Sequence, residues 1–163
     1  MIEMKKSGLF IAACIFVLAC QNEQVLGWEE TNLLACCQLP ISVLAPDSAN
    51  IKSSKLGDLY KDVTIKSGDD YFVQIYASEA TTNDIAKVKS DQLRQVKEFP
   101  FFSKIVEEDE NGFLYENIID STNINYSFRY VTVQGDMEYI FQPGMTGLFT
   151  EEQARRMYEA VQQ

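Results

Sequence analysis

Three pairs of alternating apolar and polar segments, each pair joined by turn-forming residues, constrain the fold of this chain most strongly. In the first pair, residues 61–66 and 71–78 flank a Ser-Gly-Asp-Asp turn at residues 67–70. The second pair is joined around residues 111–112 (Asn-Gly), and the third around residues 134–136 (Gln-Gly-Asp). Alternation with a period of two indicates strands, and turns of this kind join antiparallel neighbours. The chain is therefore predicted to form an antiparallel β-sheet from three hairpins.

One further strand and two helices accompany these hairpins. Residues 41–46 (ISVLAP) indicate a first strand that ends in a proline turn. Residues 81–99 carry apolar side chains at helical spacing and are followed by a proline, as is typical of an amphipathic helix. Thr150 and Gln153 form a capping box at the start of a second helix. This order of elements predicts an α+β fold, an antiparallel β-sheet with helices packed on it.

The N-terminus combines two lysines, Lys5 and Lys6, with a mostly apolar run at residues 7–19. The run is too short to span a bilayer as a stop-transfer helix, so it predicts a signal peptide. Its ending, VLAC, resembles the lipobox of bacterial lipoproteins. The resemblance implies cleavage before Cys20 and attachment of lipid to the Cys20 sulfur. A plain signal peptide and an uncleaved anchor stay open as alternatives.

The lipoprotein interpretation divides the chain into three parts. Residues 1–19 are the signal peptide, residues 20–38 are the lipidated cysteine and a polar tether, and residues 39–163 are a single α+β domain. Several acyl chains hold a protein on a membrane durably. We therefore expect a protein of the bacterial cell envelope that is bound to the membrane through its lipid anchor, with the outer membrane favoured over the inner one.

From about Leu39 to its end, the chain resembles proteins of the Mog1/PsbP-like fold, including small bacterial lipoproteins similar to DcrB. The resembling features are the strand and proline turn in ISVLAPDS, the helix after YFVQIYASE, the paired hairpins, and the closing helix after GLFT. The resemblance implies an α/β/α sandwich and a role as a binding or accessory protein. These features are topological, so no catalytic residue carries over.

Charge and composition exclude several kinds of function. The chain has 14 Lys and Arg against 24 Asp and Glu, a net charge of −10. Binding nucleic acid, or attraction to anionic lipid, requires a concentrated basic surface. The chain has no histidine, which excludes Ser-His-Asp and Cys-His catalysis and histidine-based metal sites. We predict no nucleic-acid partner, no cofactor, no metal and no catalytic residues.

The adjacent cysteines Cys36 and Cys37 allow three interpretations. A vicinal disulfide could act as a redox switch in an oxidising envelope. Neighbouring Cα atoms lie about 3.8 Å apart, however, below the roughly 4.4 Å minimum of ordinary disulfides. A closed zinc site would need carboxylates in addition to the two thiolates. The favoured interpretation is a small apolar pair with one thiol packed inward and the other outward, while a redox role stays open.

Four consecutive acids lie beside the turn of the second hairpin: Glu107, Glu108, Asp109 and Glu110. Carboxylates so concentrated could bind a hard cation such as calcium. The run lacks the alternating acids of an EF-hand loop, and like charges at a hairpin tip are commonly solvated. Both interpretations stay open for these acids.

The loop at residues 141–150 has apolar side chains within a turn-rich segment, namely Met145, Leu148 and Phe149. Exposed apolar side chains often mark a contact with another protein. Alternatively, these three side chains cover the sheet edge or fix the last helix.

Two functions of different classes remain. The first, which is favoured, is a non-enzymatic binding or accessory module with a protein partner in the envelope. The alternative is a small-ligand binder or enzyme that uses carboxylates and tyrosines in a pocket between sheet and helix. A concave site with convergent polar groups would favour the second, and a closed core with a flat apolar patch the first.

Overall fold

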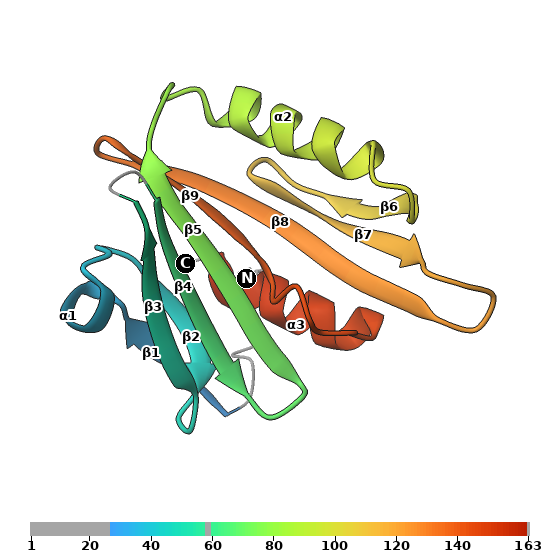
Figure 1. Ribbon diagram of the computed structural model, residues 1–163, viewed down its shortest axis with the longest axis horizontal. Coiled ribbons are helices and arrows are strands. Elements are labelled where there is room, and N and C mark those ends of the chain that lie inside the picture. The colour runs from blue at the N-terminus through green and yellow to red at the C-terminus, as the bar shows by residue number, and fades with distance from the viewer. Residues whose placement is uncertain (1–26, 58–59, 163) are drawn as a thin grey trace, which may run out of the picture.

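Seven antiparallel strands form the main sheet of the computed structural model, which describes residues 27–57 and 60–162 (Figure 1). Across the sheet the order is β3 (Asn50–Leu56), β4 (Tyr60–Ser67), β5 (Tyr71–Glu79), β9 (Met137–Pro143), β8 (Ile124–Gln134), β7 (Gly112–Ile118) and β6 (Phe102–Glu108). The three predicted hairpins are present as β4–β5, β6–β7 and β8–β9. The α+β class with an antiparallel sheet is therefore confirmed.

The predicted signal peptide and Cys20 lie outside the described residues. Within the described part of the chain, no helix has both the length and the apolar composition needed to cross a bilayer.

Glycines determine the turns of two hairpins. Gly68 between β4 and β5 has a φ of 58°, and Gly135 between β8 and β9 has a φ of 61°. Glycine enters this left-handed region at little cost because it has no Cβ. Both glycines belong to the turns that the sequence predicts.

Two helices pack on the sheet, α2 (Ile85–Lys97) and α3 (Glu151–Val161). Asp84 caps α2, because its side chain accepts a hydrogen bond from the Lys87 backbone N–H at 3.0 Å. The predicted capping box starts α3. There the Thr150 hydroxyl accepts from the Gln153 N–H at 3.3 Å, and the Gln153 side chain accepts from the Thr150 N–H at 2.9 Å.

The two helices cover opposite faces of the sheet. Tyr158 of α3 contacts Phe128 and Tyr130, with ring centroids 5.5 and 6.4 Å apart. On the other face, Val96 of α2 packs with Phe113 and Tyr115 of β7. Helix α2 lies along β8 and the β6–β7 hairpin, away from β3 and β4 (Figure 1). In the described part of the chain, a portion of the sheet face beside α2 therefore has no helix over it.

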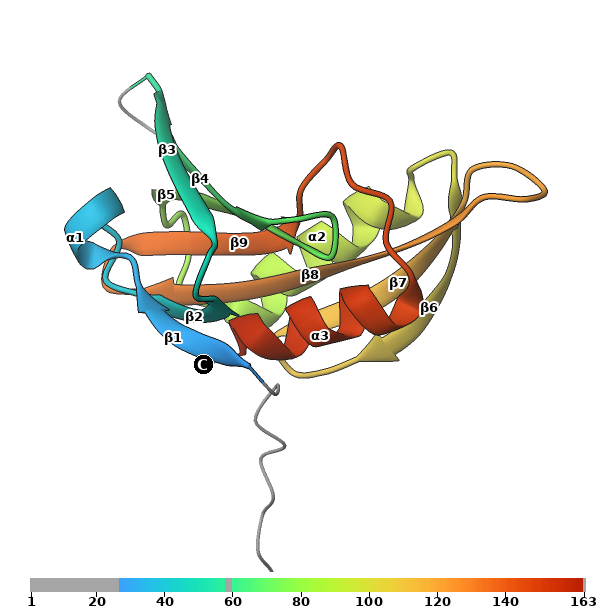
Figure 2. The same ribbon diagram turned by 90° about the horizontal axis from the view of Figure 1, so that it is seen from below.

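The folded domain begins earlier than residue 39, so the prediction of a tether up to residue 38 is wrong for its second half. Trp28–Asn32 forms β1, which pairs with Ser42–Pro46 (β2), and Leu34–Cys37 forms the short helix α1. Leu33 is 0% exposed and belongs to the main core. β1, β2 and α3 lie together on one side of the main sheet (Figure 2). Val43 and Ala45 of β2 belong to the same buried core as the apolar side of α3.

Candidate functional site

A groove of about 550 Å³ opens between α2 and the sheet face beside it. Its lining residues come from α2, β5, β7, β8, β9 and the loop that follows β9. The volume lies within the range of small-molecule sites, about 300–1,000 Å³. The groove is therefore large enough to hold a ligand.

Alternation along β7 and β8 brings a row of polar side chains into this groove. Asn125, Ser127 and Arg129 occupy every second position of β8, and all three line the groove. The residues between them face α3. Asn117 of β7 lies opposite Asn125 in the strand register. Because strand side chains alternate between faces, all four project to the side of the sheet that carries α2.

Two buried glutamines continue the polar surface across β5 and β9. Gln74 and Gln142 lie opposite each other in the register, and both are buried. Gln142 Nε2 donates to Gln74 Oε1 at 3.4 Å, and Gln74 Nε2 donates to both Asp62 carboxylate oxygens at 3.0 Å. The Asp62 carboxylate is thus engaged by Gln74, while Gln142 lines the groove.

The side-chain oxygen of Asn117 has no hydrogen-bond donor among the described residues. The residue is 7% exposed. Most buried polar atoms in folded proteins are paired, and leaving one unpaired costs about 1–3 kcal/mol. Asn117 lines the groove, and because its Oδ1 is itself buried, the side-chain amide must turn for that oxygen to meet a donor on a bound molecule.

Apolar side chains and a tyrosine border the groove. Phe99 and Met145 are both exposed, and the Tyr76 hydroxyl lies 4.0 Å from the Met145 sulfur. Burial raises the pKa of Tyr76, the Asp62 carboxylate adds to the rise, and Arg129 lowers it. The Tyr76 hydroxyl therefore stays protonated at neutral pH and can donate a hydrogen bond.

Arg129 is the only charged side chain that lines the groove in the described part of the chain. It forms no salt bridge with the described residues. Its Nη1 donates to the carbonyl of Phe128 at 3.3 Å, and a guanidinium has five N–H donors. The groove thus offers hydrogen-bond donors, amide oxygens and one positive charge. Groups of this kind can recognise a polar ligand.

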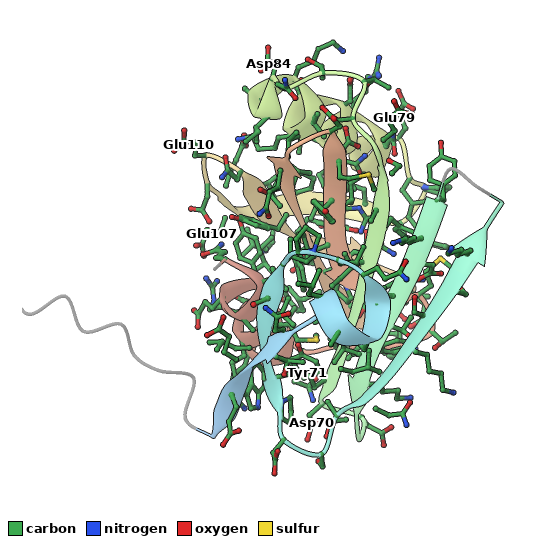
Figure 3. The ribbon with its side chains drawn as sticks, turned by 90° about the vertical axis from the view of Figure 1, so that its left-hand side faces the viewer. Asp70, Tyr71, Glu79, Asp84, Glu107 and Glu110 are labelled. Carbon is green, nitrogen blue, oxygen red and sulfur yellow. The ribbon has the colours of Figure 1, made fainter. Side chains whose placement is uncertain are left out.

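The four acids predicted as a cation site do not converge. Three bond to different partners: Glu107 to Arg155, Glu108 to Lys89, and Asp109 to the hydroxyl of Tyr158. Glu110 forms no salt bridge with the described residues, and it lies with Glu107 at one edge of the molecule (Figure 3). No group of three or more Asp, Glu or Cys side chains in the described ranges is placed to hold a metal ion.

The loop predicted as a partner contact splits into two parts. Met145 and Leu148 are 77% and 65% exposed, whereas Phe149 is 3% exposed and packs in the main core. Phe149 is also held by its backbone, whose N–H donates to Asn125 Oδ1 at 2.7 Å. For Phe149 the contact interpretation is therefore wrong and the structural alternative fits, because the side chain packs in the core just before α3.

Cys36 and Cys37 are free thiols, one exposed and one buried. Burial raises the pKa of Cys37 to about 12, and the neighbouring Cys36 adds to the rise. At neutral pH the Cys37 thiol is therefore protonated and unreactive, since the thiolate is the nucleophile. The structure gives this pair an inward and an outward side chain, and a redox role for the pair stays a prediction.

A second cavity, of about 450 Å³, lies near the loop at residues 38–40. Tyr139 lines it, and its hydroxyl is the other buried polar atom that lacks a hydrogen-bond partner in the described residues. Glu79 and Asp136 also line this cavity. Its polar groups come mostly from loops and strand ends, whereas the groove presents a continuous polar row on paired strands. The groove is therefore the stronger candidate.

The groove residues were not predicted from the sequence, although one signal was present. The segment NYSFRY (residues 125–130) alternates polar and aromatic residues, so its polar positions share one face of the strand. Such a face is commonly solvated, and the sequence does not show that α2 lies beside it. One of the two expected functions was a pocket of carboxylates and tyrosines between sheet and helix. Tyr76 and Tyr115 line the groove, but no carboxylate does among the described residues.

Comparison with known proteins identifies no relative. No protein-family model matches this chain, and no match is found among curated proteins or among solved structures. The function must therefore follow from the chemistry of the site.

Proposed function

We propose that this chain is a lipid-anchored protein of the bacterial cell envelope that binds a ligand in the groove between α2 and the sheet and catalyses no reaction. The anchor follows from Cys20 and the lipobox resemblance before it. A Mog1/PsbP-like fold is part of the proposal. It is supported by the antiparallel sheet with α2 on one face and α3 on the other.

The unpaired Oδ1 of Asn117 carries this proposal. A buried acceptor without a donor destabilises a folded protein, so an apolar side chain at the same position would cost less. The neighbouring buried amides, Gln74 and Gln142, do pair. The unpaired Asn117 oxygen beside this glutamine pair is explained if a bound ligand donates the missing hydrogen bond.

A protein partner is a second candidate, favoured by one observation. Several exposed apolar side chains border the end of the groove or the β7–β8 turn: Phe99, Phe101, Ile118, Ile124 and Met145. Phe101 and Ile118 are adjacent, because the Ile118 N–H donates to the Phe101 carbonyl at 2.9 Å. Exposed apolar patches of this kind are common at protein contacts.

A fragment screen by NMR tests the ligand groove. The full ¹⁵N-labelled chain is titrated with small molecules of up to about 20 non-hydrogen atoms, a size suited to a cavity of this volume. We expect the amide signals of Asn117, Ser127 and Gln142 to shift most. The signals around Tyr139 in the second cavity serve as an internal reference and should move little. Fragments that bind nowhere, or only near Tyr139, would contradict the proposal.

The membrane anchor has its own test. Metabolic labelling with a palmitate analogue should mark the wild type and leave Cys20→Ser unlabelled, because the thioether needs the sulfur. Lipid incorporation is measured directly, since an uncleaved apolar run could still hold the variant on the membrane. Equal labelling of both proteins would show that Cys20 is not the attachment site. Matched urea unfolding curves would show that the substitution leaves the fold intact.

A further inference from the structure

The charge distribution around the groove is the first observation about its ligand. The chain carries 24 acidic residues, yet the described lining contains none of them and contains Arg129. The nearby Asp62 carboxylate is bonded to Gln74 and forms no salt bridge with Arg129. A guanidinium without an anionic partner favours a carboxylate, which can accept two parallel N–H bonds from it.

The position of Asn117 is the second observation. Its Oδ1, which has no partner among the described residues, can accept from an N–H or O–H of a ligand once the amide turns toward the groove. Asn117 lies opposite Asn125, and Arg129 follows four residues later on β8. Four residues of strand span about 13 Å. An extended peptide covers about 3.3–3.6 Å per residue, so three or four residues connect the two groups.

The apolar border of the groove is the third observation. Val96 and Phe99 lie on the α2 side, and Met145 lies on the loop after β9. Met145 is 77% exposed, and an unbranched thioether adapts its shape to different apolar partners. Side chains of this kind fit apolar groups on a ligand whose polar backbone lies over the strands.

We propose that the groove binds the C-terminal end of a peptide with apolar side chains, which rests on the proposed function of the groove. Arg129 holds the terminal carboxylate, Asn117 Oδ1 accepts from a backbone N–H about three residues earlier, and Phe99 and Met145 contact the apolar side chains. Arg129 has no ionic partner among the described residues, Asn117 Oδ1 has no hydrogen-bond donor there, and Phe99 and Met145 are exposed, so each of these groups can accept a contact from the ligand. A single acylated amino acid is too short to meet both polar groups.

Calorimetry with the full chain tests this inference. The probes are N-acetyl-Leu-Ala-Leu with a free carboxylate, the same peptide as its C-terminal amide, and N-acetyl-leucine. A charge-assisted bond is about twice as strong as a neutral one, so the acid should bind at least about tenfold more tightly than the amide. The preference should vanish in Arg129→Gln. It should persist in Arg94→Gln, a matched control whose exposed guanidinium pairs with Asp91 on α2.

Each other result overturns the inference. An amide that binds as well as the acid, or a preference that survives Arg129→Gln, excludes a carboxylate on Arg129. N-acetyl-leucine binding as tightly as the tripeptide excludes the three-residue span, and no binding of any probe at millimolar concentration excludes the peptide ligand. If the fragment screen still shifts Asn117 and Gln142 in those cases, the groove remains a ligand site and only the ligand class is wrong. If the screen also fails, both proposals fail.

Discussion

Replacing Leu33 with alanine is expected to lower the free energy of unfolding by about 2–5 kcal/mol, because a buried leucine leaves a cavity when truncated. Leu33 is fully buried and packs in the main core. Its backbone also connects the small sheet to the domain, since its N–H donates to the Ile41 carbonyl at 3.0 Å. Its carbonyl accepts from the Cys37 and Leu39 N–H groups at 3.1 and 3.2 Å. Urea unfolding measures the change.

The adjacent leucine is a matched control. Leu34 is 56% exposed, so Leu34→Ala should change the free energy of unfolding by no more than about 0.5 kcal/mol. Both substitutions remove the same atoms from neighbouring positions. Equal free energies of unfolding for the two variants would show that the segment before residue 39 does not belong to the folded core. The predicted tether at residues 20–38 would then be right.

Elements with strong local signals could be predicted from the sequence. Gly68 and Gly135 mark turns that need a positive φ, and the alternation on either side of each turn identifies the paired strands. Thr150 and Gln153 satisfy the free amides at the start of α3 within a few residues. These features depend on residues close together in the sequence. The strand pairs of the three hairpins and the start of the closing helix could therefore be predicted.

Elements that depend on distant partners were missed. The β1 segment, WEETN, is mostly polar and shows no clear strand pattern. It forms a strand because it pairs with β2, which follows about ten residues later in the chain. β3 reads NIKSSKL, a polar edge strand with two lysines, as sheet edges commonly have. The burial of Leu33 likewise depends on which elements surround it. Periodicity cannot reveal such contacts.

The groove was hidden for the same reason. Asn117 and Arg129 lie on different strands, and each taken alone is an ordinary polar residue on a solvated strand face. Their common environment arises because β7 and β8 pair and α2 lies beside them. What the sequence does indicate is the alternation at residues 125–130, which places polar side chains on one face.

Replacing Asn117 with leucine is expected to raise the free energy of unfolding by about 1–3 kcal/mol, which is the cost of leaving a buried acceptor unpaired. The wild-type oxygen has no donor among the described residues, and the side chain is nearly buried. A residue kept for binding rather than stability should behave in this way. Tyr139→Phe is the matched control, because it removes the other buried unpaired polar atom and leaves the groove untouched.

Urea unfolding with and without the fragment that shifts the groove signals most is the most direct test of the groove as a ligand site. A ligand at 100 times its Kd stabilises a protein by about 2.7 kcal/mol. Wild type and Tyr139→Phe should both gain this increment. Asn117→Leu should be more stable than wild type without the fragment and should gain little from it. An Asn117→Leu variant that is less stable than wild type, yet gains the full increment, would contradict the account.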